Sequence, residues 1–268
     1  MDWTEFFDAQ AGRPTRSVLL RALELRAAAQ PGTFPGSAAA APDFSAPEPG
    51  GSIPAPPGTA IDLGCGEGTE TRHLLFAGWT VHAFDADPGA EARVRQGLGP
   101  AEQARLTFHR SRFEELPELP AADLLYAGFS LPFCDPAVFP ELWARIRRAL
   151  RPGAWFAGEF FGPHDDWAGR ADMNFHDRGQ VDILLADLHV ADLVEDDRPG
   201  QSAFGPRHWH LFHVIARTPP PAPTNSTEIF SKNHVLGLIQ GFSGKSSVEF
   251  VRGGRADAPP AAAPRLWV

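Results

Sequence analysis

The sequence has few cysteines and no long apolar run, and each absence excludes a class of protein. Its 268 residues include only two cysteines, Cys65 and Cys134, so no disulfide framework is expected and a reducing compartment is the simpler assumption. No stretch approaches the roughly 20 apolar residues of a membrane span. Residues 1–7 are acidic and aromatic and lack the basic flank and apolar run of a signal peptide. We therefore expect a cytoplasmic protein without a membrane partner.

The chain also lacks a cluster of basic residues. Its formal net charge is -9, and the lysines and arginines form no run. A nucleic-acid partner requires a clustered basic face, so we expect no nucleic-acid partner. A small-molecule partner of either sign is compatible with this balance. The oligomeric state does not follow from the composition.

Two segments contain few large apolar side chains. Residues 30–58 are rich in Pro, Ala, Gly and Ser and bury too little surface to offset the entropy of ordering, which predicts a flexible insert. Residues 218–268 are Pro-rich and then mixed, which predicts a disordered or loosely attached tail. The segment 1–29 is predicted to form two short helices separated by a turn at Gly12-Arg13-Pro14.

Between residues 59 and 217 the apolar pattern alternates between short strands and helices. This alternation predicts an α/β fold, a Rossmann-like three-layer sandwich with a mostly parallel sheet covered by helices on both faces. The expected strands are 60–63, 80–84, 106–109, 123–127, 154–161, 189–195 and 208–217, and the expected helices are 70–77, 88–98, 139–150 and 178–187.

The strongest motif follows the first predicted strand. The segment Asp62-Leu63-Gly64-Cys65-Gly66-Glu67-Gly68 connects this strand to a helix, and its three glycines let the backbone turn sharply and approach a ligand. About 20 residues further on, the second strand ends at Asp85. A carboxylate at this position can accept hydrogen bonds from both ribose hydroxyls of an adenosine. The order of strand, loop, helix, strand and acid predicts an adenosine-containing ligand.

Acidic residues in the loop indicate which adenosine ligand it is. A dinucleotide-binding loop has a third small residue where this chain has Thr69, and it holds a pyrophosphate at the helix N-terminus. Asp62 and Glu67 would repel a pyrophosphate, but they suit the ammonium and sulfonium charges of S-adenosylmethionine. The alternative is that both acids only cap the following helix.

With these motifs the sequence resembles the class I S-adenosylmethionine-dependent methyltransferases, and it is most similar to the small-molecule branch that includes the tellurite-resistance-type enzymes. The resemblance covers roughly residues 3–217 apart from the insert, and it implies a seven-stranded sheet with an antiparallel last strand. It also implies a methyl transferase, a transferase of EC class 2.1.1, that uses S-adenosylmethionine as cofactor and methylates a small-molecule acceptor. The matching segments are 60–69, 83–88, 122–125, 130–133 and 149–154.

The resemblance implies a set of cofactor-binding residues within residues 59–217 and the preceding helices. Arg13 is similar to an arginine that contacts the cofactor carboxylate or an anionic substrate, although an exposed arginine is the competing interpretation. The expected cofactor-binding residues are Arg13, Asp62, Gly64, Cys65, Gly66, Gly68, Asp85, Ala86, Arg112, Phe113 and Phe129.

One position departs from the family pattern. Arg112 stands where the family often has an acid that contacts the adenine amine. Phe113 lies against the adenine face in one interpretation and is a core residue in the other, and Arg112 is placed to stack on the adenine. The amine would then need a backbone carbonyl or Glu114 as its acceptor.

Residues after the fourth and fifth strands lie at the carboxyl edge of the sheet, where ligands of open α/β folds bind. Phe129 and Ser130 follow the fourth strand, and His164-Asp165-Asp166-Trp167 follows the fifth. The candidates for the substrate pocket are Ser130, Trp167, His176 and Trp209. A packed or polar loop is the alternative for Ser130 and Trp167, and capping of the next helix is the alternative for His176.

No residue is marked by the sequence as a general base. The candidates for a catalytic role are His164, Asp165 and His208, because a histidine or carboxylate at the ligand edge can accept a proton. His208 and His210 share one face of the last strand, which suits a metal, but no third ligand follows with a convincing spacing, so no metal is expected. Two other functions stay open. One is a non-catalytic S-adenosylmethionine-binding protein of the same fold, and the other is an NAD-dependent oxidoreductase, against which Asp62 and Thr69 argue.

Overall fold

The computed structural model describes residues 10, 12–29, 57–202 and 205–220. The predictions of a first N-terminal helix, of a flexible insert at 30–58 and of a disordered tail at 218–268 fall largely or wholly outside the described residues. None of the described helices is long and apolar enough to cross a membrane.

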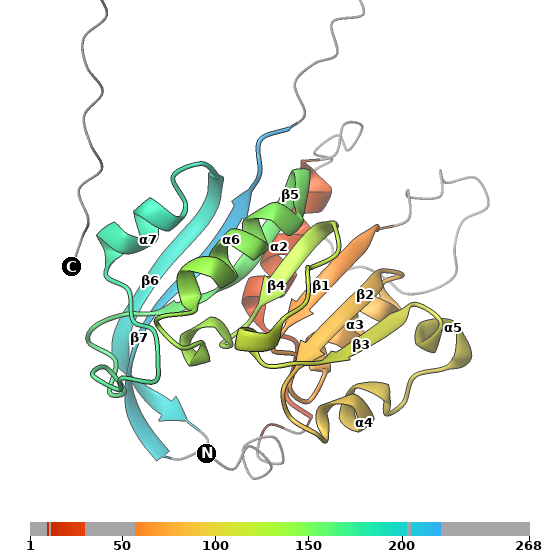
Figure 1. Cartoon of the computed structure of the whole chain (residues 1–268), viewed down its shortest axis with the longest axis horizontal. Coiled ribbons are helices and arrows are strands. Elements are labelled where there is room, and N and C mark those ends of the chain that lie inside the picture. Colours follow the sequence, from red (N-terminus) through yellow and green to blue (C-terminus); the bar gives the residue numbers. More distant parts are fainter. Residues whose placement is uncertain (1–9, 11, 30–56, 203–204, 221–268) are drawn as a thin grey trace, which may run out of the picture. The chain divides into compact units, whose positions relative to one another are not determined.

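The described residues form one seven-stranded sheet in the order β3-β2-β1-β4-β5-β7-β6 (Figure 1). β1 to β5 are mutually parallel, whereas β7 is antiparallel to both of its neighbours, β5 and β6. The predicted seven-stranded, mostly parallel sheet with an antiparallel last strand is therefore confirmed. The strands are β1 (Thr59–Leu63), β2 (Thr80–Asp85), β3 (Leu106–Arg110), β4 (Ala122–Ala127), β5 (Leu150–Phe161), β6 (His189–Ser202) and β7 (Gly205–Arg217).

Helices cover both faces of this sheet. One apolar cluster joins the sheet to α6 and α7, and a second joins its other face to α2, α3 and α4. Within β1, Ile61 and Leu63 belong to the first cluster and Ala60 to the second, because successive side chains of a strand point to opposite faces. The helices are α2 (Ser17–Ala28), α3 (Thr69–Phe76), α4 (Ala90–Arg95), α5 (Pro100–Gln103), α6 (Phe139–Ala149) and α7 (Arg178–Leu184), with short 3-10 turns η1 (Phe113–Glu115) and η2 (Leu131–Phe133).

Several predicted elements differ from the observed ones. The helix predicted at 88–98 is broken after α4, where Gly97 has a φ of 79°, and α5 follows as a separate turn. The strand predicted at 189–195 continues to Ser202, and β7 begins at Gly205 rather than 208, so the two strands form a long hairpin. Residues 196–202 are too polar to be recognised as a strand from the sequence. Their pairing with β7 satisfies the hydrogen-bonding groups of their backbone.

The loop between β1 and α3 holds the glycines in conformations that few other residues adopt. Gly64, Gly66 and Gly68 have φ values of 81°, 54° and 79°, a region that is costly for residues with a Cβ atom. The Gly64 and Cys65 amides both donate to the Phe84 carbonyl, at 2.8 and 3.0 Å. These bonds fasten the loop to the end of β2, so that the glycine loop and Asp85 lie at the same edge of the sheet.

Candidate functional site

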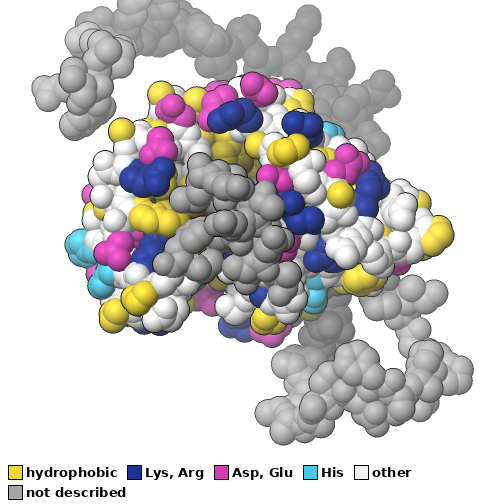
Figure 2. Space-filling view, turned by 90° about the horizontal axis from the view of Figure 1, so that it is seen from below, with side chains coloured by type: hydrophobic (Ala, Val, Ile, Leu, Met, Phe, Trp, Pro, Cys, Tyr) yellow, Lys and Arg dark blue, Asp and Glu magenta, His cyan; other side chains and the backbone are white. Residues whose placement is uncertain are grey.

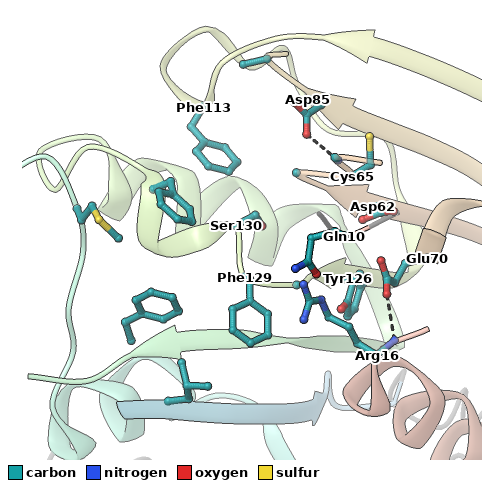
Figure 3. A pocket seen from close by; sticks show the side chains of 18 of the residues that line it. Gln10, Arg16, Asp62, Cys65, Glu70, Asp85, Phe113, Tyr126, Phe129 and Ser130 are labelled. Atoms are coloured by element: carbon teal, nitrogen blue, oxygen red, sulfur yellow. Dashed lines mark hydrogen bonds between the residues drawn. The ribbon is translucent and has the colours of Figure 1, made fainter. Parts of the chain in front are cut away.

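A cavity of about 910 Å³ opens at the carboxyl edge of β1, β2 and β4 and extends along β7 (Figure 3). This volume is near the upper end of those found for small-molecule sites. At one end its walls are the glycine loop and the end of β2. At the other end they are aromatic side chains from the segments after β4 and β5 and from β7.

Asp85 supports the glycine loop. One of its oxygens accepts the Gly66 amide at 2.8 Å, and the other accepts the Asp87 amide at 2.8 Å. Burial raises the pKa of Asp85, although these two hydrogen bonds oppose the shift. The carboxylate also lines the cavity together with Ala86, so it keeps unused lone pairs on the ligand side.

Asp62 is a buried acid at the end of β1. Its side chain accepts the Thr71 hydroxyl at 2.5 Å and also lines the cavity. Burial is the main cause that raises its pKa from 3.8 to about 8; the nearby acids Glu70, Glu67 and Asp85 contribute to this rise, and the hydrogen bond from Thr71 opposes it. A carboxyl group in this state is ready to ionise when a cation binds beside it.

Arg13 lines the cavity, but two acids occupy its guanidinium group. Its two terminal nitrogens each lie 2.6 Å from an oxygen of Glu70, and one lies 2.5 Å from Glu67. Burial alone would raise the pKa of Glu70, but the hydrogen bonds and charge of Arg13 outweigh burial and hold this pKa below its usual value. Arg13 therefore fastens the N-terminal segment to α3.

Arg16 faces the cavity, and its guanidinium has no acidic partner among the described residues; the sequence did not single it out. Its guanidinium carbon lies 4.3 Å from the centre of the Phe129 ring, and it makes no ion pair with any carboxylate in the described part of the chain. In Figure 3 the Arg16 and Gln10 side chains extend into the cavity opposite Ser130. The signal was present in Arg13-Pro14-Thr15-Arg16, but the sequence does not distinguish the two arginines.

Phe129 adopts a backbone conformation that is unfavourable for a bulky residue. Its φ is 54°, the one positive value among described residues other than glycine, and such a conformation costs about 1–3 kcal/mol. Its amide donates to the buried carboxylate of Glu159 at 3.1 Å. The neighbouring Ser130 hydroxyl donates to the Leu63 carbonyl, which joins this turn to β1.

A histidine and a buried glutamate meet at the floor of the cavity, and neither was a sequence candidate. Glu159 on β5 pairs in register with His213 on β7, and their side chains approach to 3.5 Å at Nδ1. His213 lines the cavity, whereas the Glu159 side chain is 1% exposed. Only the antiparallel pairing of β5 and β7 brings these two residues together.

The predicted cofactor residues Phe113, Arg112 and Gly68 differ in their position relative to the cavity. Phe113 projects into the cavity near Asp85 and also packs against the apolar core (Figure 3). Arg112 lines the rim, where its side chain is 72% exposed and lies 3.6 Å from Glu114. Gly68 does not line the cavity. It packs against α4 instead, where a Cβ atom on Gly68 would collide with Val94.

The predicted catalytic residues lie outside the cavity wall. His208 and His210 point to the face of β7 opposite the cavity-lining residues Arg207 and Trp209. His164 and His208 instead form hydrogen bonds to Asp197, at 2.8 and 2.6 Å. Asp165 is buried in an ion pair with Arg207. These positions correct the expectation that His164, Asp165 or His208 faces a substrate.

One further expectation about a histidine is corrected. His176 is buried between Phe139 and Phe160 rather than in the pocket, and burial lowers its pKa to about 4. His164, far from His210 in sequence, comes close to it, and ligand atoms of these two histidines and Asp197 lie within 4.8 Å of one another. Each Asp197 oxygen is already hydrogen-bonded to a histidine.

Comparison with known proteins identifies the part of the chain that carries the glycine loop. Residues 60–153 match the model of a family described as "Methyltransferase domain". This segment is therefore similar to a methyltransferase domain, and we call residues 60–153 the methyltransferase domain. This methyltransferase domain contains β1 to β4, the glycine loop, Asp85 and the start of β5.

Two curated proteins are similar to parts of the chain. The ribosomal RNA small subunit methyltransferase H of Novosphingobium aromaticivorans is 44% identical over 66 residues, which are 24% of this chain and 20% of that protein. The biotin biosynthesis bifunctional protein BioHC of Teredinibacter turnerae is 33% identical over 116 residues, which are 39% of this chain and 20% of that protein. The match therefore spans about a fifth of the length of each relative.

A solved structure supports the fold of the methyltransferase domain. TehB from Haemophilus influenzae superposes with a TM-score of 0.51 at 14% identity, covering 60% of this chain and 57% of that one. At this identity the likeness concerns the fold alone.

The residues at the glycine-loop end of the cavity fit S-adenosylmethionine. A Cβ atom at Gly64 would collide with Ser130, so the narrow turn depends on glycine. The acids Asp62 and Asp85 line this end, which suits a cationic ligand and disfavours a pyrophosphate. Arg16, which has no acidic partner in the described chain, offers donors for a carboxylate.

Proposed function

We propose that the chain transfers a methyl group from S-adenosylmethionine to a small-molecule acceptor. The observation that carries this proposal is that one cavity joins a glycine loop with two acids to an aromatic chamber. Such a cavity can bind the cofactor at one end and an acceptor at the other. The methyltransferase domain supplies the cofactor end, and the segments after it supply most of the chamber.

Each part of the cofactor end has a chemical counterpart in S-adenosylmethionine. Asp85 would accept the ribose hydroxyls, and Phe113 would pack against the adenine. Asp62 would pair with the ammonium group after losing its proton, and Arg16 would bind the carboxylate. Arg13, which the family resemblance favoured for this last role, holds Glu67 and Glu70 instead.

S-adenosylmethionine, when bound, supplies a methyl group made electrophilic by a sulfonium. The chain's own task is to align the two reactants and exclude water. Phe129 and Ser130 lie between the two ends of the cavity and border this position (Figure 3). The hydrogen bond from the Phe129 amide to Glu159 and that from Ser130 to Leu63 keep this border rigid.

His213 is the residue best placed to accept a proton from an acceptor. It lines the cavity, and the Glu159 carboxylate lies 3.5 Å from its Nδ1, so a negative charge faces the imidazolium that proton transfer would produce. We infer that His213 acts as general base for acceptors that react only after deprotonation. A thiolate or a neutral amine would not require it.

Calorimetry followed by a turnover assay tests the proposed function. We expect S-adenosylmethionine and S-adenosylhomocysteine to bind and NAD not to bind, and we expect S-adenosylhomocysteine to be released when a metabolite panel is added. NAD binding without S-adenosylmethionine binding would instead support an oxidoreductase. Cofactor binding without turnover on any acceptor would support a non-catalytic binding protein.

A further inference from the structure

The aromatic end of the cavity contains a buried arginine between two tryptophan rings. The Arg207 guanidinium carbon lies 3.5 Å from the ring centre of Trp167, 4.0 Å from that of Trp209 and 5.3 Å from that of Phe161. Its side chain is 4% exposed, yet it lines the cavity. A cation is costly to bury, so the groups that neutralise it indicate what else the site binds.

One carboxylate only partly satisfies Arg207. Its Nη2 pairs with Asp165, but Nε and Nη1 are buried without a hydrogen-bond partner in the described part of the chain. Arg207 is the described arginine with two such nitrogens. Asp165 also accepts the amides of Trp167 at 3.0 Å and His210 at 3.4 Å, so its charge is shared among three donors.

The other arginines at this end of the cavity are different. Arg170 pairs with Asp172 at 2.8 Å, and Arg198 pairs with Asp196 at 2.7 Å; all four residues line the cavity, and both arginine side chains are exposed to solvent. Water and a dedicated acid therefore satisfy these two arginines. Among the arginines at this end, Arg207 is the buried one, and its Nε and Nη1 groups have no acceptor in the described part of the chain.

The surroundings of Arg207 favour a flat, apolar ligand body. Rings meet edge to face between Phe129 and Trp209, between Phe161 and Trp209, and between Phe133 and Trp167. Such walls bind another ring through dispersion and through contacts of ring edges with ring faces. The apolar members of this chamber are Phe129, Phe133, Phe161, Trp167, Met173, Trp209 and Leu211.

We propose that the methyl acceptor is a planar aromatic molecule that carries a carboxylate, and that Arg207 binds this carboxylate. The proposal rests on the function proposed above and names the substrate class. A carboxylate supplies acceptors to unsatisfied donors and a negative charge to a cation that Asp165 only partly neutralises. A neutral carbonyl supplies acceptors alone. The carboxylate anchors the molecule, and a different atom of the acceptor receives the methyl group.

Paired probes of equal shape test this proposal without a known acceptor. Full-length protein saturated with S-adenosylhomocysteine is titrated calorimetrically with benzoate and benzamide, and with indole-3-acetate and indole-3-acetamide. We expect each acid to bind at least about tenfold more tightly than its amide, since a charge-assisted hydrogen bond contributes about 1.5–3 kcal/mol. Equal affinities for acid and amide, or no binding of either acid, would overturn the proposal.

Variants assign the preference to Arg207. Arg207→Gln is expected to abolish the preference for the acids and to leave the Kd for S-adenosylhomocysteine within twofold of the parent value. The matched control is Arg148→Gln, an exposed change on α6 outside the cavity, which should keep the preference. An Arg207→Gln protein that still prefers the acids contradicts the proposal.

Arg207→Gln also leaves Asp165 buried without its cation, so the variant can fail to fold. In that case the double variant Arg207→Gln/Asp165→Asn removes both charges and is titrated in the same way. A parent protein that does not bind S-adenosylhomocysteine would count against the proposed function itself. Retained cofactor binding without a preference for the acids would count against the substrate class alone.

Discussion

At the scale of single residues, the site shows how two neighbouring arginines acquire different roles. Arg13 and Arg16 are three positions apart, and both line the cavity. Glu70 accepts the side chain of Arg13 but only the backbone amide of Arg16, at 3.0 Å. The guanidinium of Arg16 therefore lies over the Phe129 ring and stays available for a ligand. Substitutions of Arg13 and Arg16 should therefore affect different properties of the protein.

We expect Arg16→Gln to weaken S-adenosylhomocysteine binding about 10- to 100-fold with little change in stability, because it removes a charge-assisted contact to the ligand. Arg13→Gln should instead lower the melting temperature, because Glu70 is left buried without its partner. Calorimetry and thermal unfolding of both variants check the prediction. A stable Arg13→Gln protein with normal cofactor affinity would contradict this division of roles.

Asp62 predicts proton release on cofactor binding. Because its pKa is raised to about 8, the free folded protein keeps this proton at pH 7, and a bound ammonium group should expel roughly one proton. Calorimetric enthalpies for S-adenosylhomocysteine, measured at pH 7 in buffers of different ionisation enthalpy, report the number released. Asp62→Asn should release none, and an unchanged proton count in this variant would assign the proton to another group.

The same shift sets the sign of a stability effect. Between pH 3.8 and about 8 the folded protein holds the Asp62 proton and the unfolded chain does not. The folded state then binds more protons, so the contribution of Asp62 to stability falls as pH rises through this window. Below pH 3.8 the carboxyl group is protonated in both states and contributes no pH dependence.

Asp85 supports the glycine loop, and we propose that it also binds the ribose of the cofactor. Asp85→Ala should weaken S-adenosylhomocysteine binding about 10- to 100-fold, because it removes the ribose acceptor together with the bonds to the Gly66 and Asp87 amides. Asp85→Asn retains one oxygen acceptor and should show a smaller loss. Calorimetry measures both affinities, with circular dichroism to confirm the fold. An unchanged Kd in Asp85→Ala would exclude the ribose role.

At the scale of elements, α2 determines where Arg16 lies. The N-cap of α2 is Arg16, and Leu19 one turn later is fully buried in the second apolar cluster. The buried face of α2 therefore fixes the position of Arg16 at the cavity. The cavity depends on α2 although the methyltransferase domain begins more than 30 residues after this helix ends.

Leu19→Ala should lower the free energy of unfolding by about 2–5 kcal/mol, since it leaves a void in this cluster. It should also weaken cofactor binding, because α2 no longer holds Arg16 in place. The matched control is Leu20→Ala on the same helix, where the side chain is 38% exposed and a change within about 0.5 kcal/mol is expected. Urea unfolding and calorimetry separate the two effects, and equal stability losses in both variants would contradict the docking of α2.

The hairpin of β6 and β7 divides functions between its two faces. Arg207, Trp209, Leu211 and His213 line the cavity, whereas His208 and His210 face away from it. The sequence predicted a strand here and paired His208 with His210 correctly. It did not predict which face meets the ligand, because that depends on the pairing of β7 with β5 and β6.

At the scale of the whole molecule, charge argues against a nucleic-acid acceptor, even though one partial relative is a ribosomal RNA methyltransferase. The net charge is -9, and on the face shown in Figure 2 the basic and acidic side chains of the described residues are interspersed. A duplex or folded RNA requires a continuous basic surface.

We therefore expect a fluorescent small-subunit ribosomal RNA fragment to show no change in anisotropy with up to tens of micromolar protein at about 150 mM salt. A basic RNA-binding protein serves as the positive control. Saturable binding that weakens steeply with salt would contradict this expectation and would reopen an RNA acceptor.

The sequence by itself determined the class of fold and the cofactor loop. Glycine conformations and strand periodicity are local properties, so the segment from Asp62 to Gly68, the acid at Asp85 and the order of the strands were predicted correctly, whereas the break after α4 and the lengths of β6 and β7 were not. The residues of the acceptor end depended instead on contacts between distant segments. Arg207 meets Trp167 across 40 positions, and Glu159 meets His213 only through sheet pairing. Side-chain partners that far apart are selected by packing and charge in the folded chain, which is why Arg16, His213 and Arg207 emerged only from the tertiary structure.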